Sequence, residues 1–218
     1  MPEREAISVL LVDDHAVVRE GYRRLLERAT GIVVVGEAAS AAEAYQVFSQ
    51  CRPHVVVMDI SLPDVSGIEA MRRLLMREPQ ARVLVFSIHD EPIFPTRAFR
   101  AGARGYVTKA SAPEVLVNAV RAVAAGSIFL SPDVAQTVAL RNVLDAEDAL
   151  KVISDREFEV LRLLALGHTV REIAEKLSLT YKTVANYQSS IRQKLGADNS
   201  VQLIRIAEEY GLIVRTDR

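Results

Sequence analysis

Five polar side chains in the first half of the chain could together support transfer of a phosphoryl group. Each lies at or just after the end of an apolar run typical of a β-strand, and they are Asp13, Asp14, Asp59, Ser87 and Lys109. In an open parallel α/β sheet, ligands bind at the carboxyl ends of the strands. We therefore expect these side chains to converge on one cleft.

The charges of this set favour a bound cation. Three carboxylates in one cleft repel each other unless a cation lies between them. Mg²⁺ suits the site because it prefers carboxylate, carbonyl and water oxygens. A single strand-end Asp is usually a turn or cap residue, so it is the coincidence at successive strand ends that favours chemistry. The set predicts Mg²⁺ as a cofactor, with a hydroxyl and an ammonium group facing a phosphoryl group.

Alternating strand and helix patterns would place these residues at one edge of a sheet. Strands are expected at residues 7–12, 32–36, 54–58, 82–87 and 104–108. Helices are expected at residues 15–29, 40–50, 67–77, 92–102 and 112–125. Five such repeats predict a doubly wound, five-stranded parallel α/β sheet of the flavodoxin-like type.

A different pattern follows residue 126. A helix is predicted at residues 132–143, with Pro132 in its first turn. Residues 142–149 are polar and acidic and show no clear period, which indicates a flexible linker. Residues 153–213 predict four helices, with capping boxes that start at Ser154 and Thr169. Cap residues are also expected at Thr180 and Ser200, and a short turn after the second helix gives a helix-turn-helix pattern. The predicted divisions are residues 1–126, a linker with a helix at 127–150, and an all-α domain at 151–218.

Composition limits the class of protein. The 218 residues carry a net charge of −1, but residues 151–218 hold 11 basic against 9 acidic residues. The only cysteine is Cys51, which excludes a disulfide framework. The charged N-terminus lacks the apolar core typical of a signal sequence, so none is expected, and no apolar run approaches the roughly 20 residues of a membrane span. We expect a cytoplasmic protein with no membrane partner.

Several motifs, in this order, resemble one known family. They are Val12-Asp13-Asp14-His15, Met58-Asp59-Ile60-Ser61-Leu62-Pro63 with Gly67, Ser87, Gly105-Tyr106-Val107-Thr108-Lys109, Ser154-Asp155-Arg156-Glu157, Gly167, Glu172-Ile173-Ala174, Lys182-Thr183-Val184 and Lys194-Leu195-Gly196. The chain resembles, over nearly its whole length, the two-component response regulators of the NarL/FixJ family, which join a receiver to a LuxR-type helix-turn-helix domain. Residues 94–97 and Tyr187 are similar to a GacA/UvrY-like branch.

The resemblance implies a role for each receiver residue. Asp59 would be the phosphoacceptor, supplied by a sensor histidine kinase. The metal ligands would be Asp13, Asp14, Asp59 and the backbone carbonyl of Ser61.

Three further receiver residues would act on the transferred group or respond to it. Lys109 would pair with Asp59 before transfer and with the phosphoryl group after it. Ser87 would donate a hydrogen bond to that group, and Tyr106 would change rotamer as Ser87 moves inward. Ile88 departs from the small residue often found after Ser87, and it is expected to crowd the site. His15 is expected to be a loop or cap residue, while His89 and Ser61 could tune the lifetime of the aspartyl phosphate.

The third helix of the second domain would bind double-stranded promoter DNA. At about 100° per residue, Val184 and Ile191 share an inner face, and an acid-free polar face lies opposite. The predicted contacts are Lys182, Thr183, Ala185, Asn186, Ser189, Arg192, Gln193 and Lys194. Asn186 is the best candidate to read a base, because an amide pairs with adenine through two hydrogen bonds.

These expectations describe a phosphorylation-controlled transcription regulator and not an enzyme, one that forms a homodimer when phosphorylated or bound to DNA. A phosphatase or phosphotransferase is the first alternative. It is disfavoured because Ser61, and not a second acid, stands two residues after Asp59. The second alternative is a DNA-binding protein that does not depend on phosphorylation. The sequence leaves open whether the receiver inhibits by docking or activates by dimerisation.

Overall fold

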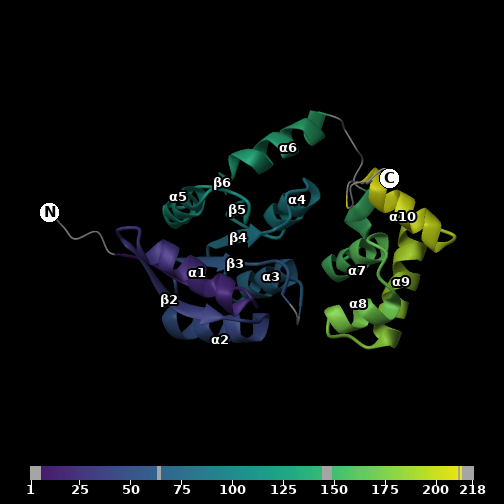
Figure 1. Ribbon diagram of the computed structural model, residues 1–218, viewed down its shortest axis with the longest axis horizontal. Coiled ribbons are helices and arrows are strands. Elements are labelled where there is room, and N and C mark those ends of the chain that lie inside the picture. Colours follow the sequence, from purple (N-terminus) through teal and green to yellow (C-terminus); the bar gives the residue numbers. More distant parts are fainter. Residues whose placement is uncertain (1–5, 63–64, 144–148, 211, 213–218) are drawn as a thin grey trace. The chain divides into compact units, whose positions relative to one another are not determined.

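The computed structural model describes residues 6–62, 65–143, 149–210 and 212. They form two compact units (Figure 1), an α/β unit that extends to Val138 and a helical unit made mainly of residues 139–218. Each unit is described by itself. Among the described residues, no helix is both long enough and apolar enough to cross a lipid bilayer.

The α/β unit is built on one parallel sheet. Its strands are β1 (Ile7–Val12), β2 (Ile32–Ala38), β3 (Val55–Met58), β4 (Val83–Ser87), β5 (Gly105–Thr108) and β6 (Phe129–Leu130). They are arranged in the order β2-β1-β3-β4-β5-β6, and every neighbouring pair is parallel. The predicted doubly wound fold is confirmed. The sheet has six strands where five were predicted, because β6 has only two residues and so shows no alternation of apolar and polar residues.

Helices cover both faces of this sheet (Figure 1). They are α1 (Ala16–Glu27), α2 (Ala41–Cys51), α3 (Gly67–Arg77), α4 (Ile93–Arg100) and α5 (Pro113–Ala124). Leu26 of α1 and Val120 of α5 share a buried core with one face of β1, β3 and β4. On the other face, a Cβ atom at Gly36 would meet Val47 of α2 and Leu10 of β1. The β3 segment is buried at every position, as expected of a strand between two helical layers.

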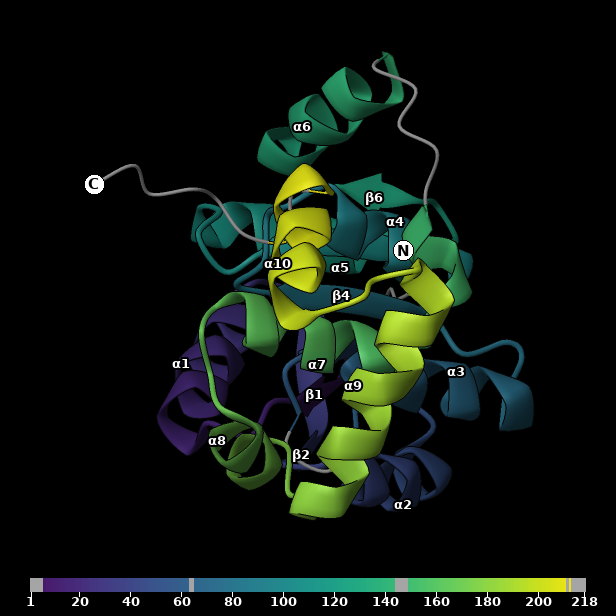
Figure 2. The same cartoon turned by 90° about the vertical axis from the view of Figure 1, so that its right-hand side faces the viewer.

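The chain continues through α6 (Pro132–Val143) and the short 3₁₀-helix η1 (Ala149–Val152) into a helical unit (Figure 2). Its helices are α7 (Asp155–Ala165), α8 (Val170–Lys176), α9 (Tyr181–Leu195) and α10 (Ser200–Glu209). The four predicted helices are therefore present. Most of the predicted 142–149 linker, residues 144–148, lies outside the described residues.

The caps of these helices mostly follow the sequence. Both predicted capping boxes form, at Ser154 and at Thr169, and Thr180 caps α9. The cap predicted at Ser200 is wrong. Asn199 caps α10 instead, since its side chain accepts a hydrogen bond from the backbone N–H of Gln202 at 3.0 Å.

Candidate functional site

The carboxyl ends of β1, β3 and β5 meet around the side chain of Lys109. Its Nζ atom donates hydrogen bonds to Oδ2 of Asp13 and to Oδ2 of Asp59, both at 2.6 Å. Backbone bonds fix this geometry: the N–H of Asp59 donates to the carbonyl of Val12, and the N–H of Lys109 donates to the carbonyl of Ser87. Residues from four strand ends are thus brought together as the sequence predicted.

Burial makes this ion pair unusual. The side chains of Asp59 and Lys109 are 4% and 12% exposed. Burial raises the pKa of the Asp59 carboxyl, and the attraction of Lys109 reduces that rise without cancelling it. Burial also opposes the charged form of Lys109, but Asp59 and Asp13 more than offset this, so the pKa of the ammonium group is raised. Lys109 therefore keeps its positive charge at neutral pH, directly beside the Asp59 carboxylate.

A second group of ligand atoms lies at the end of β1. One atom from each of Asp13, Asp14 and His15 lies within 4.8 Å of the others. Oδ1 of Asp14 is buried and accepts no hydrogen bond, although Nδ1 of His15 lies 2.9 Å away. Two carboxylates with an unsatisfied oxygen fit a hard cation such as Mg²⁺. His15 is the N-cap residue of α1, in agreement with its predicted loop or cap role, and its ring also lies beside the two acids, which the sequence did not indicate.

The loop after Asp59 is held close to the same cleft. The backbone N–H of Ser61 donates to Oδ1 of Asp59 at 3.0 Å. A Cβ atom at Gly67, the first residue of α3, would lie 2.2 Å from the carbonyl oxygen of Asp59. Only glycine permits this approach without displacing the backbone, so Gly67 positions α3 against Asp59. The metal role of the Ser61 carbonyl stays a prediction.

Ser87 and Tyr106 both bond to the segment that follows β4. Oγ of Ser87 accepts a hydrogen bond from the backbone N–H of His89 at 3.2 Å, and the hydroxyl of Tyr106 donates to the carbonyl of His89 at 2.7 Å. Ser87 and Tyr106 are fully buried. The His89 ring stacks on Phe94 and its Nε2 lies 3.4 Å from Oγ of Ser61. Ile88, which was expected to crowd the cleft, is 66% exposed, so most of its side chain faces solvent.

In the helical unit, α9 has the two faces that the sequence predicted. Val184 and Ile191 are buried on its inner face. Of the predicted DNA contacts, Thr183 and Ala185 are half-buried, and the exposed ones are Lys182, Asn186, Ser189, Arg192, Gln193 and Lys194.

Lys194 is held inside its own unit by an ion pair. Its Nζ atom lies 2.7 Å from Oε2 of Glu157 on α7, and Ser190 donates to the other oxygen of that carboxylate at 2.6 Å. Burial raises the pKa of Glu157, but the bonds from Lys194, Ser190 and Ser154 outweigh burial and lower the pKa to about 2. The sequence pattern identified Glu157 only as part of a capping box.

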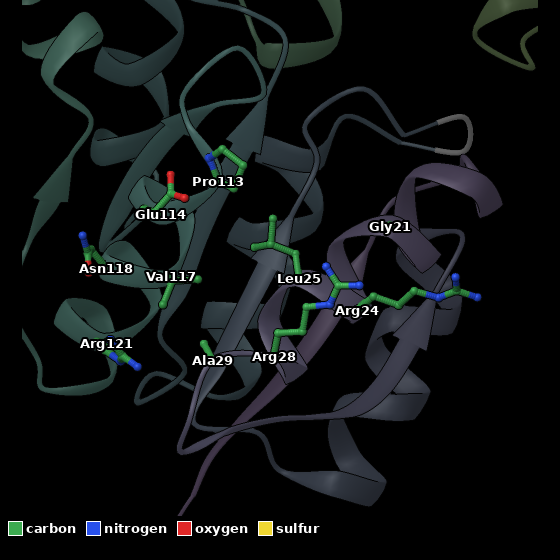
Figure 3. Close-up of a pocket in the computed structure, with 10 residues that line it drawn as sticks. All are labelled: Gly21, Arg24, Leu25, Arg28, Ala29, Pro113, Glu114, Val117, Asn118 and Arg121. Carbon is green, nitrogen blue, oxygen red and sulfur yellow. The ribbon is translucent and has the colours of Figure 1, made fainter.

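A groove on the α/β unit lies apart from all of these residues. It is lined by Gly21, Arg24, Leu25, Arg28 and Ala29 of the α1 segment and by Pro113, Glu114, Val117, Asn118 and Arg121 of α5 (Figure 3). None of the residues predicted for phosphoryl transfer lines it.

Both halves of the chain match family models. Residues 9–121 match the response regulator receiver domain, and residues 151–207 match the bacterial regulatory proteins of the luxR family. Response regulator GacA of Pseudomonas aeruginosa is 37% identical over 209 residues, covering 95% of this chain and 98% of that protein. Response regulator UvrY of Escherichia coli K12 is 36% identical over 208 residues, covering 94% and 95%.

The chain belongs to the NarL/FixJ family of two-component response regulators.

Solved structures of response regulators are also similar to this chain. A LuxR-family two-component response regulator from Aurantimonas sp. SI85-9A1 is 49% identical over 63% of this chain and 99% of its own, with a TM-score of 0.62. RcsB of Salmonella typhimurium is 27% identical over 95% and 99% of the two chains, with a TM-score of 0.70. RcsB in complex with DNA is 28% identical over 92% and 96%, with a TM-score of 0.61. This NarL/FixJ regulator is thus a phosphorylation-controlled transcription regulator that binds DNA through its LuxR-type domain.

Proposed function

We propose that Asp59 is the phosphoacceptor of this regulator and that a sensor histidine kinase supplies the phosphoryl group. The observation that carries this proposal is the buried contact of Asp59 with Lys109, beside Asp13 and Asp14 at the carboxyl ends of the strands. A receiver domain has little covalent chemistry to perform beyond positioning its nucleophile and neutralising charge. These side chains supply both functions.

The transfer step follows from this arrangement. An oxygen of the Asp59 carboxylate attacks phosphorus, a P–N bond to the kinase histidine breaks as an O–P bond forms, and the electron pair stays on the imidazole nitrogen. Mg²⁺, held by Asp13 and Asp14 together with Asp59 and the Ser61 carbonyl, would neutralise charge on the phosphoryl oxygens. Lys109 passes from the carboxylate of Asp59 to a phosphoryl oxygen, since its charge is already directed at the site.

The signal would leave the site through Ser87. A Ser87 side chain that moves inward to donate its O–H to a phosphoryl oxygen would change its contact with the N–H of His89, which its oxygen accepts here. The same backbone segment accepts the hydrogen bond of Tyr106. Tyr106 is already buried in this structure. Phosphorylation would therefore change the stability of this inward rotamer and not its direction.

The output would be promoter DNA bound by α9. Its outward face carries Lys182 and Asn186, and none of its predicted contact residues is acidic, which suits a groove lined by phosphates. We propose Asn186 as the base reader and Lys182 as a phosphate contact. Lys194 is paired with Glu157, so its predicted contact with DNA would have to compete with that ion pair. A structure of two RcsB dimers bound to two parallel DNAs supports the proposal that this chain also binds DNA as a dimer.

Acetyl phosphate labelling of the full chain tests the assignment of Asp59. With Mg²⁺ present, intact mass should rise by a single phosphoryl group, and Asp59→Asn should abolish the rise. Asp90→Asn is the matched control, because Asp90 is an exposed acid just beyond β4. Equal labelling of Asp59→Asn and the wild type would exclude Asp59 as the phosphoacceptor.

A further inference from the structure

The segment between α5 and α6 is joined to the receiver sheet beside Tyr106. β6 lies beside β5 (Figure 1), and in their pairing Phe129 stands opposite Gly105 and Leu130 opposite Tyr106. The N–H of Ser131 donates to the carbonyl of Tyr106 at 3.0 Å. The first residues of α6 therefore follow any displacement of β5.

A side-chain contact adds to this backbone attachment. Oγ1 of Thr108, the last residue of β5, donates to Oδ2 of Asp133 in the first turn of α6 at 2.6 Å. Oγ of Ser111 lies 3.3 and 3.4 Å from the two oxygens of the same carboxylate. Thr108 is only 1% exposed. A short hydrogen bond from a buried hydroxyl to a carboxylate is stronger than a neutral one, so this contact ties β5 to α6.

Thr108 is also the immediate neighbour of Lys109. Thr108 ends β5 and Lys109 is the first residue of the turn that follows. Here Lys109 reaches Asp59 and Asp13, while Thr108 reaches Asp133. One peptide unit therefore links the phosphoacceptor site to the helix that leads toward the DNA-binding unit.

We propose that Asp133 is a positioning residue which, through Thr108, couples the start of α6 to the state of the phosphoacceptor site. The inference rests on the proposed role of Asp59 and Lys109. When Lys109 moves from a carboxylate to a phosphoryl oxygen, the backbone it shares with Thr108 shifts, and the bond to Asp133 changes in length or breaks. Because coupling between two sites is reciprocal, the contact between Thr108 and Asp133 also biases the position of Lys109.

A purely structural role for Asp133 makes a different prediction. An Asp in the first turn of a helix stabilises the exposed N–H groups there without reference to any neighbour. That role survives in Thr108→Val, which removes the hydroxyl, keeps the branched shape and leaves Asp133 in place. Coupling does not survive in this variant.

Hydrogen exchange of the full-length protein separates the two roles. The probe is beryllofluoride with Mg²⁺, a mimic of the phosphoryl group on an aspartate. In the wild type, beryllofluoride should change the exchange rates of amides in residues 129–136 on the order of fivefold or more. In Thr108→Val and in Asp133→Ala this change should disappear, while the amides of residues 59–61 still respond. The double variant should lose no more than either single variant, because both remove one contact.

Glu114→Gln is the matched control. It removes an exposed acid from the first turn of α5 and should keep the full wild-type response at residues 129–136. A full response in Thr108→Val, or no response of these residues in the wild type while residues 59–61 respond, would overturn the coupling. Absence of any wild-type response at residues 59–61 would instead count against the proposed role of Asp59. If one variant does not fold, the other still decides the question.

Discussion

The hydroxyl of Tyr106 on β5 donates a hydrogen bond of 2.7 Å to the backbone carbonyl of His89, and the Tyr106 side chain is fully buried. The Ser87 side chain accepts a bond from the N–H of the same His89. The peptide groups of one residue are therefore held by the two side chains that were predicted to transmit the signal. Both predicted switch residues therefore contact the backbone of the segment between β4 and α4.

Replacing Tyr106 by Phe should separate the chemistry of the receiver from its output. The variant loses one buried hydrogen bond, so its free energy of unfolding should be lower than that of the wild type by about 1–2 kcal/mol. Asp59 should still be labelled by acetyl phosphate, but phosphorylation should raise DNA affinity less than in the wild type. Chemical denaturation and titration of labelled DNA measure the two effects.

Tyr45→Phe is a suitable control for this prediction. Its hydroxyl also donates to a backbone carbonyl, that of Ala70, at 3.0 Å and away from the β4 segment. It should cost less stability than Tyr106→Phe, because its hydrogen bond is only partly buried, and it should leave the response to phosphorylation intact. An undiminished response in Tyr106→Phe would remove Tyr106 from the pathway.

Asp14→Ala should abolish both Mg²⁺ binding and phosphorylation of Asp59. Oδ1 of Asp14 lies beside Asp13 and His15 at the end of β1 and accepts no hydrogen bond, as suits a metal ligand. Calorimetric titration of the wild type should give weak affinity, roughly in the millimolar range, because Mg²⁺ keeps several of its waters. Asp90→Asn should leave both properties unchanged. Phosphorylation of Asp14→Ala at the full rate with a chelator present would contradict the metal role.

The sequence predicted that the candidate receiver residues converge, because these residues follow strands directly. Asp13, Asp59, Ser87 and Lys109 stand at strand ends, and the parallel order of the strands brings them to one edge without further information. The inner and outer faces of α9 were predictable for a similar reason, since one helical period determines both.

Contacts between residues far apart in the chain were not predictable in this way. Thr108 and Asp133 are 25 residues apart, and Glu157 and Lys194 are 37 apart. Each of these side chains has an ordinary local interpretation, as a strand, cap or surface residue. Only the tertiary structure selects the partner. The prediction of the α10 cap was wrong by one residue, because Asn199 and Ser200 are adjacent and both residue types are suitable N-caps.

Two substitutions on α9 should have different effects on DNA binding. Asn186→Ala should relax sequence preference at a cost of about 1–3 kcal/mol if its amide reads a base. Lys182→Ala should weaken binding to specific and random DNA alike and reduce the salt slope by about one unit. A binding survey in which each base of the site is varied, at several salt concentrations, measures both.

Arg205→Ala controls for the loss of a cation from the same unit. Arg205 is 79% exposed on α10 and pairs with Glu209, so its loss should leave the salt slope unchanged. If Asn186→Ala keeps the wild-type selectivity for DNA bases, Asn186 is not the base reader.

Glu157 should make the stability of the helical unit depend on pH at the acid end. Burial raises its pKa, but Lys194, Ser190 and Ser154 lower it from 4.5 to about 2. A carboxyl whose pKa is lower in the folded state stabilises that state above its unfolded pKa. The contribution is lost as pH falls from about 4.5 through about 2.

Comparing Glu157→Gln with the wild type isolates this contribution. At pH 7 the free energy of unfolding of the variant should be lower by about 1–2 kcal/mol, because Lys194 loses its partner and a partly buried network is broken. The difference should shrink as pH is lowered from about 4.5 toward 2, where the wild-type carboxyl also becomes neutral. Glu172→Gln is the matched control, since Glu172 occupies the same position of the α8 capping box and is exposed. A difference that stays constant down to pH 2 would show that the ion pair with Lys194 contributes nothing through its charge.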